Sequence, residues 1–434
     1  MARLRFQCLF DGRKWRQDVV VEVDPGGMVR SVQEAGSKET EPALGGTVLP
    51  ALPNLHSHAF QRRMAGRAER RGPQGKDSFW TWRKRMYREA ERLTPAQLEE
   101  DAFELYRVLR DRGFGSVAEF HYVHHQSDGT PYEDPLQMLS PLIRAANRVG
   151  IRLCLLPVLY QRAGFDAPRP LARQRRFVHE LDAYLKLLDL AANHLKGSRH
   201  RLGIAFHSLR AVTLEAMQEV LSFRRTWDPK APVHVHVAEQ PQEVADCLAA
   251  HGRRPVDQLL EALPVDESWC LVHGTHTTPE ELAGIAECGA VVGLCPSTEA
   301  NLGDGIFDLP ALLDRDGRFG IGTDAHVGVC PFEELRWLEY GQRLRTGRRV
   351  IVDRPTDHVG TNCWLHASEG GAQALGLPIG RIAPDFAADW LLIDSPVLNE
   401  APPAERLDLL VFRGGVPAPE VWLGGRPRPP AETA

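Results

Sequence analysis

The sequence lacks the features of several classes of protein. No apolar stretch is long enough to cross a lipid bilayer, which argues against an integral membrane protein. The formal net charge is only −5 and the arginines are scattered, so nothing favours a nucleic-acid partner. Internal repeats and low-complexity tracts are also absent. The composition, 43% hydrophobic and 25% charged, is ordinary for a soluble globular protein.

The chain also lacks the cysteine spacing of a structural zinc site or of a redox motif. Its eight cysteines are spread along the sequence without a Cys-x-x-Cys pair. Several lie in apolar runs, where a free cysteine behaves as a small hydrophobic residue. The first residues, Met1 to Phe6, lack the apolar core of a secretory signal. We therefore expect reduced cysteines and a cytoplasmic protein.

The two ends of the chain share a β-rich character that the middle does not have. Residues 1–48 contain short β-branched runs and turns, such as Val19–Val23. From residue 385 onward, further strand-like runs include Leu409–Phe412, with Gly and Pro turns between them. The pattern predicts one small β-sandwich domain built from residues 1–48 and 385–434.

The middle of the chain, residues 49–384, alternates strand-like and helix-like segments, which is typical of parallel α/β architecture. Helical spacing is clearest over Leu98–Leu109, Phe177–Leu195, Leu214–Phe223 and Glu280–Glu287. The strand candidates are Val48–Leu52, Ser116–Phe120, Arg152–Val158, Leu202–Phe206, Val233–Ala238, Cys270–His273, Ala290–Leu294 and Phe319–Gly322. Strands and helices in this order predict a (β/α)8 TIM-like barrel, whose chemistry lies at the carboxyl ends of the strands.

Two histidines follow the first of these strand candidates. His56 and His58 are two residues apart, and side chains at that spacing in an extended chain point the same way. They can therefore converge on one metal ion, although an isolated His-x-His pair also occurs by chance on surfaces. The pair gains weight because three later strand candidates also end in His or Asp.

The run Val233–Ala238 carries two histidines on one face, His234 and His236. His236 is nearer the carboxyl end, so we predict that it is the metal ligand and that His234 lies one layer down in the barrel interior. Glu239 follows three residues later. A carboxylate in that place can move protons during hydrolysis, while the alternative is an acid that stabilises a helix N-terminus.

His273 and Asp324 complete the set. His273 is predicted either to bind the metal or to orient the attacking water. Asp324 is predicted to bind the metal and to hold a proton, its alternative role being an N-cap. A mixed N/O set suits Zn²⁺ or another first-row divalent ion, which lowers the pKa of water to about 7. The predicted metal ligands are His56, His58, His236 and Asp324.

This pattern, with His-x-His on predicted strand one, His on five, His on six and Asp on eight, resembles the amidohydrolase superfamily. The resemblance covers the whole chain and implies the barrel and the split β domain. The segment from His236 to Glu239 is similar to the deaminase branch, which implies catalytic roles for Glu239, His273 and Asp324. Members with two metal ions carry a Lys after strand four, where this chain has Phe206-His207. One ion, of zinc type, is therefore expected.

A narrower resemblance is to the family of formimidoylglutamate deiminases. The segments that carry it are Asn54–Gln61, Ser78–Arg83, Glu119–His125, His207–Arg210 and Ser297–Gly305. It implies hydrolysis of N-formimino-L-glutamate to N-formyl-L-glutamate and ammonia in histidine degradation, by an enzyme that is commonly a homodimer. The residues matching the family's substrate-binding groups are Gln61, Arg83, Tyr122, His207 and Arg210.

Elementary chemistry is consistent with these substrate-binding residues, because guanidinium groups bind carboxylates bidentately and the substrate is a dicarboxylate. Two alternatives stay open: Arg83 as a surface helix residue and Tyr122 as a packed aromatic. Among functions, the nearest rival is another deaminase or chlorohydrolase of the superfamily, acting on a nucleobase or triazine. A non-catalytic relative is a further rival, but such proteins typically lose metal ligands and none is missing here.

Overall fold

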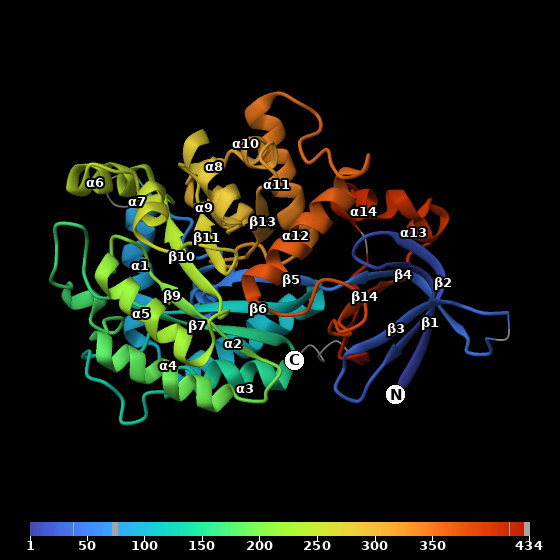
Figure 1. Cartoon of the computed structure of the whole chain (residues 1–434), viewed down its shortest axis with the longest axis horizontal. Helices are drawn as coiled ribbons and strands as arrows, with labels where there is room; N and C mark the ends of the chain where they lie inside the picture. Colours follow the sequence, from blue (N-terminus) through green and yellow to red (C-terminus); the bar gives the residue numbers. More distant parts are fainter. Residues whose placement is uncertain (38, 72–76, 416, 429–434) are drawn as a thin grey trace.

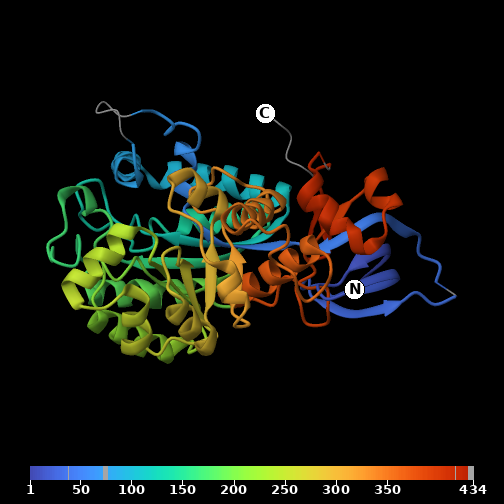
Figure 2. The same ribbon diagram turned by 90° about the horizontal axis from the view of Figure 1, so that it is seen from above.

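Two sheets form the framework of the computed structural model, which describes residues 1–37, 39–71, 77–415 and 417–428. Figures 1 and 2 show them side by side: a sheet surrounded by helices, and a smaller sheet that contains both ends of the chain. Within the described ranges, no helix combines the length and the apolar character needed to cross a membrane.

The larger sheet is parallel and closes into a barrel. Its strands are β5 (Leu52–Ser57), β6 (Phe114–His121), β7 (Arg152–Leu159), β8 (Arg201–Leu202), β9 (Ile204–Phe206), β10 (Val233–Val237), β11 (Trp269–His273), β12 (Val291–Leu294) and β13 (Arg318–Ile321). The short strands β8 and β9 both pair with β7 and occupy one position. Closure occurs where the His56 carbonyl accepts hydrogen bonds from the N–H groups of Thr323 and Asp324, at 3.1 and 3.0 Å. The predicted (β/α)8 fold is confirmed.

Helices cover the outside of the barrel. They are α1 (Phe79–Arg92), α2 (Pro95–Arg112), α3 (Ser140–Val149), α4 (Leu181–Leu195), α5 (Leu214–Trp227), α6 (Pro241–His251), α7 (Pro255–Ala262), α8 (Pro279–Cys288), α9 (Pro296–Leu302), α10 (Leu309–Leu313), α11 (Pro331–Thr346) and α12 (Val359–Leu375). The local sequence explains the start of α2, where Thr94 and Gln97 form a capping box and Pro95 occupies the first turn. Short 3₁₀ turns are η1 (Ala59–Met64) and η2 (Ala172–Gln174).

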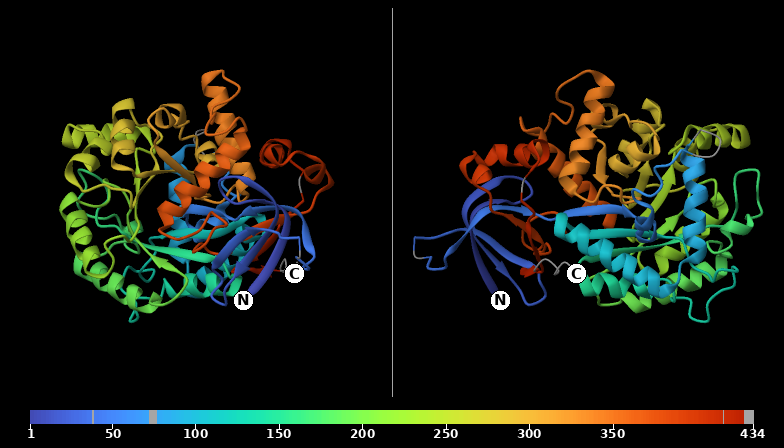
Figure 3. Two further views of the ribbon diagram at one scale, coloured as in Figure 1. Left: turned by 45° about the vertical axis from the view of Figure 1, so that its right-hand side comes forward. Right: turned by 180° about the vertical axis from the view of Figure 1, so that it is seen from behind.

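The smaller sheet joins the two ends of the chain, as Figure 3 shows for the blue and red segments. Its hydrogen-bonded order is β16-β15-β14-β4-β1-β2-β3, with bounds β1 (Ala2–Phe10), β2 (Trp15–Val23), β3 (Val29–Glu34), β4 (Ala43–Pro50), β14 (Trp390–Ile393), β15 (Glu420–Leu423) and β16 (Arg426–Arg428). Phe6, Trp390 and Trp422 form part of a separate small core. The exact domain boundaries at residues 48 and 385 stay a prediction, and residues 429–434 lie outside the described ranges.

Two expected strands differ from the structure. Val48–Leu52 is divided between the sheets: β4 ends at Pro50, β5 begins at Leu52, and His56 lies inside β5. The change of sheet occurs where Ala51 N–H bonds the Asp389 carbonyl and Leu52 N–H bonds that of Gly113. One continuous apolar run thus packs into both the core around the barrel and the core of the smaller sheet.

Leu409–Phe412, predicted as a strand, is helical instead. It lies in the π-helical turn η4 (Leu409–Arg413), which continues α14 (Arg406–Asp408) after α13 (Pro396–Glu400) and η3 (Pro403–Glu405). Leu410 and Val411 are buried there. A short apolar run has no periodicity that separates a strand from a buried helical turn.

Candidate active site

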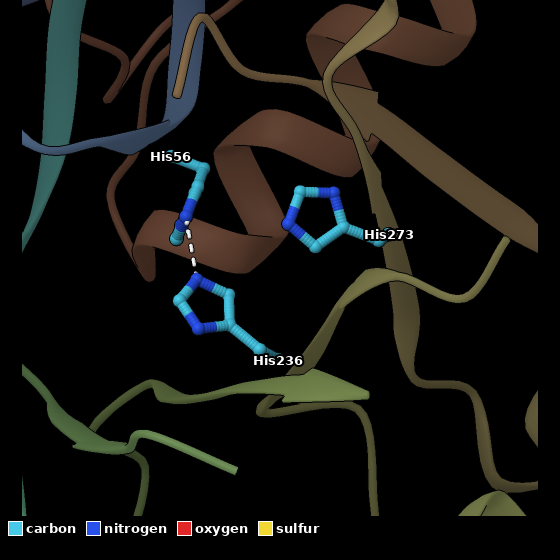
Figure 4. Close-up of side chains that lie close together, drawn as sticks. All are labelled: His56, His236 and His273. Carbon is cyan, nitrogen blue, oxygen red and sulfur yellow. Dashed lines mark hydrogen bonds between the residues drawn. The ribbon is translucent and has the colours of Figure 1, made fainter. Parts of the chain in front are cut away.

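Three imidazoles from two barrel strands meet at the carboxyl ends of the strands. The Nε2 atoms of His56, in β5, and His58, just after it, lie 3.1 Å apart. The Nε2 atom of His236, in β10, lies 2.9 Å from that of His56. Figure 4 shows His56 and His236 facing each other, with His273 of β11 beside them. The spacing of two residues in β5 therefore brings both histidines to one point.

Asp324 joins the histidines from the opposite side of the barrel seam. Its Oδ1 atom lies 3.2 Å from His58 Nε2 and 3.6 Å from His56 Nε2. The next helix, α11, begins at Pro331 and is preceded by Cys330, so Asp324 is not its N-cap. Asp324 has a φ of 46°, in the left-handed region where a non-glycine residue is strained. Such strain is typical of functional sites.

The donor set fits a metal ion. Imidazole nitrogens about 2.1 Å from a tetrahedral zinc ion lie about 3.4 Å apart, close to the separations observed here. Burial lowers the pKa of His56, of His236 and, to about 3, of His58, so all three rings are neutral, the form that binds metals. The Nδ1–H group of His58 donates to the Phe120 carbonyl at 2.7 Å, which leaves Nε2 facing the cluster.

His273 ends β11 between carboxylates. Its Nε2 atom lies 3.9 Å from Glu239 Oε1 and 3.9 Å from Asp324 Oδ2, and its Nδ1 atom lies 3.3 Å from Glu299 Oε1. Burial lowers the pKa of His273, but these carboxylates outweigh it and raise the pKa to about 10. The ring is thus placed to donate a hydrogen bond toward the cluster.

Glu239 points into the site instead of capping a helix. Its side chain is buried, and the preceding residue, Ala238, has a φ of 51°. Helix α6 begins at Pro241, and no hydrogen bond among the described residues links the Glu239 carboxylate to the first turn of α6. The Glu239 N–H instead donates to Glu243 Oε2 at 3.2 Å. The carboxylate is therefore free to face His273.

All five predicted substrate-binding residues line one cavity beside this cluster. Its complete lining is His58, Gln61, Phe79, Trp82, Arg83, Met86, Tyr122, His207, Arg210, His236, Glu239, His273, Leu302 and Asp324. Residues from α1, from η1 and from the loops after several barrel strands thus meet over the histidines. The cavity therefore brings together residues that are far apart in the sequence, from His58 to Asp324.

The two arginines of the cavity are not paired with carboxylates of the described residues. Arg210 is only 6% exposed, and its Nε atom has no hydrogen-bond partner within those residues. Arg83 Nη2 donates to the Tyr160 hydroxyl at 3.4 Å, and its guanidinium lies over the rings of Trp80 and Tyr87. Arg83 therefore faces the cavity and is not a surface helix residue. Buried guanidinium groups without an acidic partner suit an anionic ligand.

The neutral side of the cavity supplies further polar groups. Gln61 Nε2 donates to the Tyr122 hydroxyl at 2.8 Å, while Gln61 Oε1 is buried without a partner in the described part of the chain. Tyr122 is both packed, with ring contacts to Phe60 and His58, and exposed to the cavity through its hydroxyl. Burial lowers the pKa of His207, whose Nδ1 atom lies 3.2 Å from Ser208 Oγ.

Sequence analysis missed two buried acids near the site, Glu299 and Asp304, and predicted correctly that His234 lies in the barrel interior. Glu299, which contacts His273, lies in a segment that carried the family resemblance. Asp304 lies in the same segment and accepts a hydrogen bond from Gln240; burial, with the nearby Glu239 charge, raises its pKa to about 9. No spacing rule connects these residues to the strand ends. His234 bonds the Ala374 carbonyl at 2.8 Å, inside the barrel and away from the cluster.

Comparison with known proteins agrees with the fold. The model of the amidohydrolase family matches residues 47–417, and the chain belongs to that family. It is 48% identical to the formimidoylglutamate deiminase of Pseudomonas aeruginosa over 406 residues, which cover 92% of this chain and 88% of that protein.

Solved structures are similar over nearly the whole chain. The crystal structure of an amidohydrolase from Brucella melitensis is 38% identical, with a TM-score of 0.92 and coverage of 98% of this chain and 94% of that one. An adenosine deaminase from Xanthomonas campestris, solved with bound zinc, has a TM-score of 0.81 at 21% identity, covering 98% and 92% of the two chains. The second likeness shows the fold alone.

Proposed function

We propose that this protein hydrolyses N-formimino-L-glutamate to N-formyl-L-glutamate and ammonia, a step of histidine degradation. The observation that carries the proposal is the 48% identity to a formimidoylglutamate deiminase over 92% of the chain. The cavity supports it independently, because two arginines without acidic partners in the described part of the chain line it together with the histidine–aspartate cluster. The two carboxylates of the substrate require a cationic pocket, and its formimino carbon requires a hydrolytic centre nearby.

The substrate carboxylates would bind at the cationic end. Arg210 and Arg83 each offer a planar fork of donors that matches a carboxylate. Tyr122 and His207, whose rings are in contact, line the same cavity and would supply neutral polar contacts. The carbonyl oxygen of Gln61 lacks a partner among the described residues and would accept hydrogen bonds from the N–H groups of the formimino end. A nucleobase site would need stacking and ring-edge contacts in place of two cations.

We infer that one divalent metal ion, zinc, is held by His56, His58, His236 and Asp324. The neutral imidazoles and the spacing of their nitrogens support this assignment. When bound, such an ion supplies Lewis-acid chemistry, which makes water acidic enough to act as hydroxide near pH 7. The loop after β9 begins with His207 and has no lysine there, which supports a single ion.

The protein's own groups would move the protons. Glu239 Oε1 and Asp324 Oδ2 each lie 3.9 Å from His273 Nε2, and these two carboxylates would take up the proton of the attacking water. His273, between them, donates to the attacking oxygen and orients it. As the oxygen adds to the formimino carbon, Glu239 would pass the first proton of the water to the terminal nitrogen. The second proton, released from the new hydroxyl group to Asp324, would reach the same nitrogen. The carbon–nitrogen bond then breaks, ammonia leaves, and the formyl group remains on glutamate.

We also propose a homodimer in the cytoplasm. Helix α11 exposes Trp337, Tyr340 and Leu344, by 54%, 39% and 82% respectively. Their spacing places them along one side of the helix, where a second copy can cover them. All eight cysteines are free, which supports a reducing compartment. Light scattering of the purified protein tests the dimer, and Leu344→Glu should shift it toward the monomer.

The direct test is ammonia release by purified protein from N-formimino-L-glutamate, N-formiminoglycine, guanine and cytosine. Turnover of N-formimino-L-glutamate well above the other three supports the proposal. Activity on guanine or cytosine that survives Arg210→Ala would support the nucleobase rival instead. Release of ammonia from none of the four substrates by metal-replete protein would remove the proposed function.

A further inference from the structure

Glu299 is a buried carboxylate that the proposed chemistry does not use. It lies in α9, directly after β12, and it is buried beside His273, which lines the active-site cavity. One of its oxygens, Oε1, accepts a hydrogen bond from His273 Nδ1–H at 3.3 Å. The same oxygen accepts one from the Cys295 backbone N–H at 2.8 Å. One acceptor thus joins the start of α9 to the ring of His273.

We propose that Glu299 is a positioning residue for His273. Its acceptor oxygen holds the imidazole in one orientation, with Nδ1 protonated and Nε2 presented to the cavity between Glu239 and Asp324. This inference rests on the proposed deiminase function, because it assigns the His273 ring a task in that reaction. It extends the site to a residue that does not line the cavity.

The geometry gives this bond a specific purpose. His273 is the last residue of β11 and has a φ of 71°, so its backbone leaves the strand direction at the point where the ring is needed. The two Nε2 neighbours, Glu239 and Asp324, are each 3.9 Å away, too far for a hydrogen bond to fix the ring. Glu299 makes the shorter contact, and in a histidine the partner of one nitrogen sets the state of the other.

A purely structural role would be capping of α9 through the Cys295 N–H. The substitution Glu299→Gln tests whether the negative charge of Glu299 matters, because it removes the charge and keeps an acceptor oxygen. Because the Cys295 N–H needs an acceptor, Glu299→Gln would place its amide oxygen where Oε1 now lies, and that oxygen would also accept from His273. Glu299→Ala removes both bonds. A matched control is Glu334→Ala, since Glu334 is a buried acid that bonds Ser297 at the start of the same helix without touching His273.

The experiment compares the wild type with Glu299→Ala, Glu299→Gln and Glu334→Ala in steady-state ammonia release and in zinc content. We expect Glu299→Ala to lower kcat about 10- to 100-fold, as loss of such an orienting group does, with KM and zinc content nearly unchanged. Glu299→Gln should restore kcat to within a few-fold of wild type. Glu334→Ala should reduce the thermal midpoint but leave kcat near wild type.

A spectroscopic measurement tests the ring itself, independently of turnover. In protein labelled with ¹⁵N-histidine, the His273 signals are assigned by their loss in His273→Gln. They should show a protonated Nδ1 in the wild type and in Glu299→Gln, and a changed protonation pattern in Glu299→Ala. An unchanged pattern in Glu299→Ala would overturn the inference.

Two kinetic results would also overturn it. One is an equal loss of kcat in Glu299→Gln and Glu299→Ala, which would mean that the charge matters and the acceptor does not. The other is a loss in Glu334→Ala as large as in Glu299→Ala, which would mean that α9 alone is responsible. A wild-type protein inactive on N-formimino-L-glutamate would instead remove the proposed function, while the ¹⁵N comparison would still test the bond.

Discussion

The two ends of the active-site cavity are built by different means. At one end, neutral histidines and Asp324 come from barrel strands or from the one to three residues after them, and the closed sheet holds them in place. At the other end, Arg83 comes from helix α1 and Arg210 from the loop after β9, and both are cations without acidic partners among the described residues. The contrast separates reaction chemistry, placed on a rigid scaffold, from substrate recognition, placed on connecting segments.

The largest effect should come from loss of the metal-binding end. Treatment with a chelator should abolish measurable ammonia release because it removes the metal ion. The substitution His236→Ala should do the same because it removes one of the converging imidazoles. Zinc should restore the chelated wild type but not His236→Ala. Metal analysis checks both results. If His236→Ala binds zinc stoichiometrically and turns over substrate, the ligand set is wrong.

Glu239→Gln should be next in size. It removes the group that moves protons while keeping the shape of the side chain, so kcat should fall about 10²- to 10⁴-fold. KM and zinc content should stay close to wild type, because Glu239 belongs to neither the predicted ligand set nor the carboxylate-binding end. The control is Gln242→Ala, on the exposed face of α6. Equal rates in Glu239→Gln and wild type would remove Glu239 from its role.

Arg210→Ala tests the cationic end. Loss of a charge-assisted hydrogen-bonding pair costs about 1.5–3 kcal/mol, which corresponds to an increase of about 10- to 150-fold in KM. Zinc binding should be unaffected, because the two ends are independent. As a control, Arg173→Ala should leave KM unchanged, because Arg173 is an exposed arginine of η2 that does not line the cavity. A loss of zinc in Arg210→Ala would contradict the separation of the two ends.

Tyr122→Phe should have the smallest effect. It removes one neutral hydroxyl and the Gln61 hydrogen bond, which together are worth about 1 kcal/mol or a few-fold to tenfold in kcat/KM. Stability should change little, since the aromatic ring and its packing against Phe60 remain. Circular dichroism and kinetics on N-formimino-L-glutamate check the two statements. A loss as large as that of Arg210→Ala would make Tyr122 a main anchor of the substrate.

The same contrast explains what could be predicted from sequence. Period-two spacing in an extended chain was enough to place His56 and His58 together, and the strand-end rule of barrels placed His236, His273 and Asp324 beside them. No such rule applies to Arg83 or Arg210, which were predicted from the family resemblance. The strand assigned to Leu409–Phe412 was wrong because four apolar residues carry no period.

By itself the sequence determined the order of strands and helices, the β-rich character of both ends and the residues able to bind a metal, because these depend on local periodicity and side-chain chemistry. Only the tertiary structure decided how the apolar run near Ala51 divides between two sheets and that Glu299 reaches His273. It also decided that Arg83 and Arg210 face the cavity without a carboxylate partner among the described residues. Those contacts join residues far apart along the chain, so they arise from barrel closure and packing, which local sequence patterns do not encode.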